Sequence, residues 1–147
     1  NALPESAVLR GTYRSFNDFV RTQLEQSIQH LAKTVADSFN MTAKIHINPE
    51  NPGYPVTVNT PDETASAIRA ATVVAGDDCV NTNPTPSMGA EDFAFMLQQK
   101  PGCYLWIGNG SSDGDCLLHN PNYDFNDEIL PLGAAYWVKL IENELHC

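Results

Sequence analysis

The spacing of apolar residues changes twice within the first 48 residues, and this pattern limits the possible folds more than any other feature. Residues 7–16 and 41–48 alternate between apolar and polar side chains, which predicts two strands. Between them, Asn17 and Asp18 can cap and charge the start of a helix. The apolar stripe predicted for this helix is Val20, Leu24, Ile28, Leu31 and Val35. The sequence therefore predicts a β-α-β unit.

This unit is too small to stand alone, because it covers one face of two strands with a single helix. We therefore expect further chain to precede Asn1. A segment rich in Pro, Asn and Gly at residues 48–55 predicts a linker to the remainder of the chain.

After the linker, helices are predicted to alternate with short apolar strands. A capping box with proline at the first helical position opens a helix at residues 60–63, and the last helix is predicted over 131–145. A further helix is predicted to follow residues 87–90, with short strands near residues 79–80 and over 103–107. This alternation predicts an α/β layer with a mostly parallel sheet.

Charge and composition exclude some partners. The chain of 147 residues carries 8 basic and 18 acidic side chains, and its net charge of −10 repels nucleic acid. The sequence contains no apolar run of about 18 residues, so it predicts no membrane-spanning helix. The four cysteines form no C-x-x-C pair, which favours reduced thiols, and we take the cytoplasm as the default compartment.

His119 is the histidine best placed for chemistry. It follows a predicted strand and loop and lies next to the rigid Pro121 turn, so its imidazole could bind a metal or act in acid–base catalysis. Asp124 or Asp127 could orient it. The commoner alternative is a loop histidine that hydrogen-bonds to a neighbouring carboxylate. A catalytic zinc site needs about three protein ligands, so either the chain is not a metalloenzyme or the other ligands precede Asn1.

Two other places could bind an anion. Arg14, on the polar face of the first predicted strand, could hold a carboxylate, although a solvated strand face is commoner. The turn at residues 87–90 could present free N–H groups at a helix start. Glu91 and Asp92 are adjacent on the predicted helix and point about 100° apart, which argues against a catalytic carboxylate pair.

Several of these stretches occur together in the order typical of one known family. They are residues 1–4, 11–16, 54–55 with Asn59, 87–93, 101–102 and 119–127. With them the chain resembles the aminoacylase, hippurate hydrolase and carboxypeptidase group of di-metal metallopeptidases. It most closely resembles the amidohydrolase branch that cleaves N-acyl and indoleacetyl amino acids.

The resemblance implies an architecture. Residues 1–55 correspond to the second part of a ferredoxin-like lid, through which we expect a homodimer. Residues 56–147 correspond to the C-terminal part of a mostly parallel α/β metallohydrolase domain. The half-complete β-α-β unit agrees with this division.

The resemblance also implies site roles. His119 would be a metal ligand, Asn1 and Arg14 would bind the substrate carboxylate or the oxyanion, and the turn containing Ser87, Met88 and Gly89 would line the substrate pocket. Each site would hold two divalent metals, zinc or manganese, and a metal-bridging water would attack the amide of a small N-acyl amino acid. We expect the general-base glutamate and the other ligands upstream, so this chain has no catalytic residue and is inactive alone. The alternative is a non-catalytic binding or dimerisation module derived from such an enzyme.

Overall fold

A computed structural model describes residues 2–47, 53–110 and 118–145 of the chain, which form two compact units. The first unit comprises Asn1–Val56 and Ser87–Asp92, and the second comprises Thr57–Pro86 and Phe93–Cys147. The first division falls beside the predicted linker, while the segment at residues 87–92 groups with the N-terminal part of the chain. No helix in the described ranges combines the length and the apolar character needed to cross a bilayer.

Helix α1 (Asp18–Ser38) begins where its capping residue predicts. The Asn17 side chain accepts a hydrogen bond of 2.8 Å from the backbone N–H of Val20, which satisfies an unpaired donor of the first turn. The helix ends at Ser38, and Asn40 adopts a left-handed φ of 54° just beyond it, a conformation that asparagine often supplies after a helix. Both ends of this helix are therefore set by local sequence.

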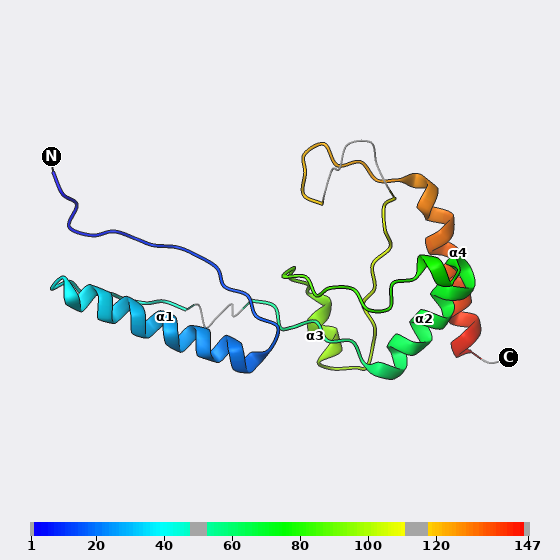
Figure 1. The fold of residues 1–147 in the computed structure, drawn as a ribbon, viewed down its shortest axis with the longest axis horizontal. Coiled ribbons are helices and arrows are strands. Elements are labelled where there is room, and N and C mark those ends of the chain that lie inside the picture. The colour runs from blue at the N-terminus through cyan, green and yellow to red at the C-terminus, as the bar shows by residue number, and fades with distance from the viewer. Residues whose placement is uncertain (1, 48–52, 111–117, 146–147) are drawn as a thin grey trace. The chain divides into compact units, whose positions relative to one another are not determined.

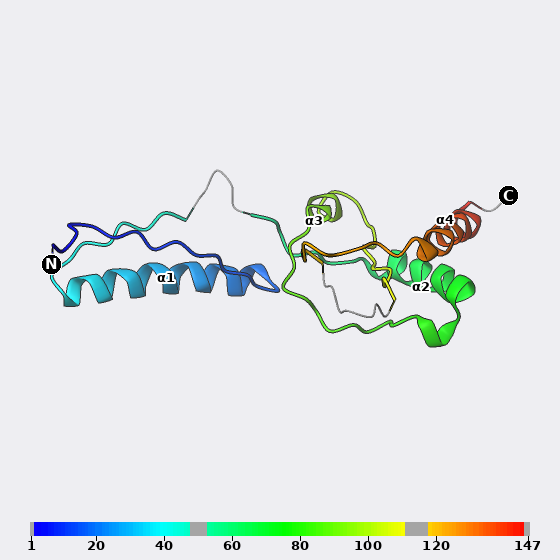
Figure 2. The same ribbon diagram turned by 90° about the horizontal axis from the view of Figure 1, so that it is seen from above.

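The apolar stripe of α1 is largely uncovered. Ala36 is the buried residue of this helix, whereas Leu31 is 60% exposed and Val35 is 55% exposed. The segments 2–16 and 41–47 run alongside α1 (Figures 1 and 2), yet no described residue of either segment is assigned to a strand. Two strands under one helix bury too little surface to hold a sheet by themselves, which explains this difference from the sequence prediction. Residue 48 lies outside the described residues.

The second unit is built around helices α2 (Pro61–Ala75) and α4 (Leu130–Glu144), which pack against each other (Figure 1). Its buried α2 residues are small: Ser66, Ala67 and Ala70. Small side chains allow the other helix to approach closely, and Tyr136 of α4 is 5% exposed. The Ser66 hydroxyl donates a hydrogen bond to the Glu144 carboxylate across the pair.

The bounds predicted for the last helix are confirmed to within one residue, but most of its predicted buried face is exposed. The spacing of apolar residues in this helix predicts a buried stripe of Ala134, Trp137, Leu140, Ile141 and Leu145, but Trp137 and Ile141 are 59% and 54% exposed. Leu140 of this stripe is half-buried, and Tyr136, which lies outside the stripe, is buried. Adjacent helical positions point about 100° apart, so the small residues of α2 select a neighbouring stripe of α4 for the contact.

The start of α2 is confirmed, but the reciprocal capping box is not formed, since no side chain caps this helix. The Thr60 hydroxyl donates to the Glu63 carboxylate. It also accepts a 2.9 Å hydrogen bond from the backbone N–H of Gly102. The threonine therefore ties the start of α2 to Gly102, a contact that competes with the local cap.

Two short elements differ from their predictions. The strand predicted near residues 79–80 is instead a single turn of 3₁₀ helix, η1 (Asp77–Cys79), closed by a 3.2 Å hydrogen bond from the Val80 N–H to the Asp77 carbonyl. Helix α3 (Phe93–Leu97) begins after Glu91 and Asp92, so these carboxylates do not lie in its first turn. The predicted anion-binding helix start at residues 87–90 is therefore not present.

Residues 103–107 do not pair with another strand in the described structure. The side chain of Asn59 forms hydrogen bonds with the backbone of this segment instead. The Asn59 amide accepts a 2.8 Å hydrogen bond from the Tyr104 N–H and donates a 2.8 Å hydrogen bond to the Tyr104 carbonyl. The rings of Phe93, Tyr104 and Trp106 form a row with centroid separations of 5.6 and 5.7 Å. The predicted parallel α/β sheet stays a prediction.

Candidate functional site

His119 lies in a tight turn with an uncommon backbone conformation. Its φ of 70° falls in the left-handed region, which residues other than glycine rarely adopt. Behind it, the Asn120 side chain accepts a 2.9 Å hydrogen bond from the Asn122 N–H, and the Asn120 carbonyl accepts one of 2.9 Å from the Tyr123 N–H. His119 is exposed at the head of this turn. Strained backbone at an exposed histidine is typical of functional sites.

The side chains of Asn109 and Asn126 form hydrogen bonds that hold the chain just after the His119 turn in place. The Asn109 side chain accepts from the Asn126 N–H at 2.8 Å and donates to the Asp124 carbonyl at 3.0 Å. The Asn126 side chain donates to the Asn109 carbonyl at 3.2 Å and accepts from the Glu128 N–H at 3.0 Å. This Asn109–Asn126 clamp joins residues 109 and 124–126, and it also caps η2 (Asp127–Ile129), which leads into α4. The turn is therefore tied to the α2–α4 body.

The carboxylates predicted to orient His119 do not contact it. Within the described part of the chain, no hydrogen bond or ion pair joins its imidazole to Asp124 or Asp127. Asp124 contributes its backbone carbonyl to the clamp, while its side chain is exposed, as is that of Asp127. The structure therefore also gives no support to the alternative, a loop histidine that hydrogen-bonds to a neighbouring carboxylate.

The residues described do not form a complete metal site. No group of three or more His, Cys, Asp or Glu side chains comes together among them. An exposed imidazole on a fixed turn suits one ligand position, but a catalytic metal needs about three protein ligands. A metal bound there would therefore need further ligands from outside the described residues.

The other predicted site residues belong to the first unit. Arg14 is exposed and follows Tyr13, whose hydroxyl donates a hydrogen bond to the Glu25 carboxylate on α1. Ser87, Met88 and Gly89 form an exposed stretch that is grouped with the same unit. Asn1 lies outside the described residues. Arg14 and His119 fall in different units.

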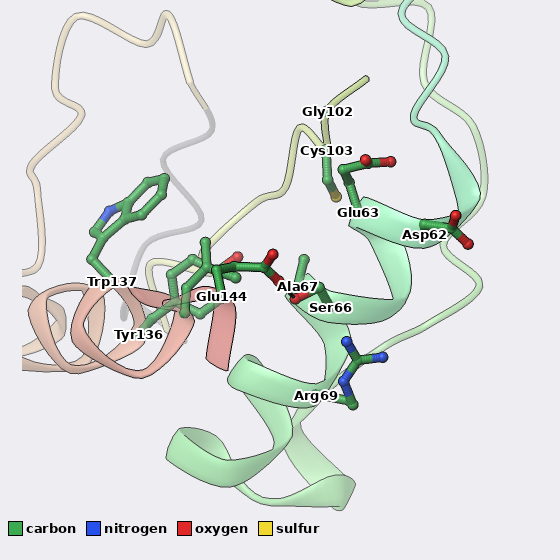
Figure 3. A pocket seen from close by; sticks show the side chains of 11 residues that line it. Asp62, Glu63, Ser66, Ala67, Arg69, Gly102, Cys103, Tyr136, Trp137 and Glu144 are labelled. Carbon is green, nitrogen blue, oxygen red and sulfur yellow. Dashed lines mark hydrogen bonds between the residues drawn. The ribbon is translucent and has the colours of Figure 1, made fainter. Parts of the chain in front are cut away.

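The sequence analysis missed a groove in the second unit (Figure 3), with a volume of about 440 Å³. Side chains of α2, side chains of α4 and residues 102–103 line it. Burial raises the pKa of the Tyr136 phenol, and the Cys103 thiol beside it adds to the effect. The signal that could have found this groove is the position of Tyr136 on α4, four residues before Leu140 of the predicted stripe. Nothing in its chemistry singles out a ligand.

Comparison with known proteins decides the family. A family model described as peptidase family M20/M25/M40 matches residues 5–143. The chain belongs to this peptidase family. The family resemblance predicted from the sequence motifs is therefore confirmed. Peptidases of this family generally depend on divalent metal ions.

Three relatives show the range of activities in the family. A hippurate hydrolase of Campylobacter jejuni is 30% identical over 140 residues, covering 95% of this chain and 35% of the relative. The thermostable carboxypeptidase 2 of Saccharolobus solfataricus is 27% identical over 136 residues, covering 91% and 33%. An N-acetyldiaminopimelate deacetylase of Pediococcus pentosaceus is 26% identical over 146 residues, covering 99% and 36%. The chain thus spans about a third of the length of these relatives. No solved structure matches it.

Proposed function

We propose that the chain is the C-terminal part of a metal-dependent amidohydrolase that cleaves the amide bond of small N-acyl amino acids. The observation that carries this proposal is the family match over residues 5–143, in a family with hydrolase relatives. Hippurate and N-acetyldiaminopimelate, the compounds in the names of two relatives, both join an acyl group to an amino acid through an amide. That shared bond defines the proposed substrate class.

The proposed site is assembled from several parts of the protein. His119 supplies one metal ligand, and the remaining ligands and the general-base glutamate come from a preceding segment. Zinc and manganese are the candidate metals, with two ions in each site. These metals, when bound, would supply Lewis-acid activation of the amide carbonyl. The fixed, exposed turn of His119 supports its role, because an imidazole ligand needs a set orientation.

The first unit contributes substrate contacts in this proposal. The guanidinium of Arg14 can form two parallel hydrogen bonds with a substrate carboxylate, and it is exposed as such a contact requires. Asn1 contributes to the same recognition, and Ser87, Met88 and Gly89 line the pocket. This unit would also be the second part of a ferredoxin-like lid that mediates a homodimer. The uncovered apolar stripe of α1 supports further packing there.

The test is hydrolysis of hippurate by the intact protein, measured as released glycine before and after treatment with a chelator. We expect turnover that falls at least about 10-fold on chelation and returns when zinc or manganese is added, because the metals activate the amide. Hippurate amide, which lacks the free carboxylate, is the matched control substrate and should be cleaved more slowly. Chelator-resistant turnover would contradict the metal requirement. Absence of turnover on a panel of N-acyl amino acids, together with a stoichiometric protein partner, would favour the non-catalytic module.

A further inference from the structure

A cluster of three polar side chains joins the N-terminal segment to α1. The Tyr13 hydroxyl donates a hydrogen bond to the Glu25 carboxylate, which lies 12 residues further along the chain. Arg21, one helical turn before Glu25, donates to the same oxygen through its Nε at 3.2 Å. The carboxylate therefore receives hydrogen bonds both from its own helix and from the segment that runs alongside it (Figure 2). This contact fixes the position of Tyr13 along α1.

The pKa directions agree with this arrangement. The hydrogen bond from Tyr13 is the main cause of the lowered pKa of Glu25, and the same bond is the main cause of the raised pKa of Tyr13. An ionised carboxylate and a protonated phenol are the forms that this bond needs. Both shifts widen the pH range in which the two forms coexist, so the bond persists around neutral pH.

Tyr13 and Arg14 differ in their surroundings although they are neighbours. Tyr13 is half-buried against α1, whereas Arg14 is exposed. Consecutive side chains of an extended chain point to opposite sides. Fixing the tyrosine side chain on the helix therefore also fixes the direction in which the arginine side chain leaves the backbone.

We propose that Tyr13 is a positioning residue that acts through Glu25 to hold Arg14 in the orientation for binding a substrate carboxylate. This inference rests on the proposed function, in which Arg14 makes that contact. A bidentate guanidinium–carboxylate pair depends on geometry, so a freely rotating segment would bind the same group more weakly. Neither Tyr13 nor Glu25 needs to touch the substrate.

The experiment measures KM and kcat of the intact protein for hippurate in four variants: Tyr13→Phe, Glu25→Ala, Arg14→Ala and the double variant Tyr13→Phe/Arg14→Ala. Loss of one hydrogen bond is expected to raise KM about 3- to 10-fold in either Tyr13→Phe or Glu25→Ala, with kcat within about 2-fold of the parent. Arg14→Ala should raise KM further. Adding Tyr13→Phe to Arg14→Ala should change nothing more, because the tyrosine acts through the arginine.

The matched control is Glu142→Ala, which removes an exposed carboxylate from a helical ion pair with Lys139 on α4. It should leave KM unchanged. Glu25→Ala also keeps the test decisive if Tyr13→Phe fails to fold. The positioning role is overturned if neither variant raises KM, or if Tyr13→Phe raises KM equally with Arg14 absent. If Arg14→Ala itself leaves KM unchanged, the contact assigned to Arg14 in the proposed function is wrong. If the parent protein hydrolyses no N-acyl amino acid, the proposed function fails, and the inference that rests on it falls too.

Discussion

Replacing His119 with alanine in the intact protein is expected to lower its affinity for divalent metal by about 100-fold or more. The change removes an imidazole that we propose as a direct ligand, and even residues that only orient ligands typically contribute 10- to 100-fold. The measurement is the metal content of the protein after dialysis against zinc buffered by a competing chelator. A titration against the same chelator gives the affinity.

The control for this variant is His30→Ala. His30 is an exposed histidine of α1 in the first unit, so its removal deletes an imidazole of similar exposure without touching the turn at residues 119–123. The His30→Ala variant should bind divalent metal with the same affinity as the parent protein. A His119→Ala protein that keeps full metal occupancy would remove His119 from the ligand set.

Replacing Tyr136 with alanine is expected to lower the free energy of unfolding by about 3 kcal/mol, the largest effect on stability that we anticipate. The ring is 5% exposed and packs where the small residues of α2 meet α4. Truncating a buried aromatic removes its burial and leaves a cavity, which typically costs about 3–5 kcal/mol. Denaturant unfolding of the intact protein, followed by circular dichroism and fluorescence, measures the loss.

Trp137 is the matched control, since it is the adjacent aromatic on the same helix and is 59% exposed. Its ring lies edge-on to Tyr136 with centroids 5.3 Å apart. Trp137→Ala should therefore cost about 1 kcal/mol or less, mainly through the lost ring contact. Equal losses for the two variants, or a larger loss for Trp137→Ala, would show that the α2–α4 packing is wrong.

The helix starts could be predicted because they depend on nearby residues. Asn17 caps α1 with its own side chain, and the proline at position 61 suits the first turn of α2. The buried face of α4 could not be predicted, because two helical stripes of that segment are apolar. The small residues of α2, more than 60 positions earlier, select the stripe through Tyr136. Strands require backbone partners, and no described residue of 7–16 or 103–107 is assigned to a strand.

The candidate site shows the same division between local and distant signals. His119 could be singled out because a histidine beside an Asn-Pro-Asn turn is a local pattern. The Asn109–Asn126 clamp could not be predicted from the sequence, because it joins the Asn109 amide to backbone groups 15 and 17 residues away. The Tyr13–Glu25 contact was missed for a similar reason, since it depends on how the extended segment lies along α1. Both contacts join residues that lie 12 to 17 positions apart, so local sequence patterns do not reveal them.

A crystal structure of the intact protein grown with zinc, with anomalous diffraction recorded at the zinc edge, tests the central claim most directly. The account predicts a zinc ion about 2.0–2.1 Å from an imidazole nitrogen of His119, with its other ligands contributed from outside residues 1–147. Zinc bound at a site that leaves His119 uncoordinated would contradict it, as would hippurate hydrolysis by a protein stripped of divalent metal.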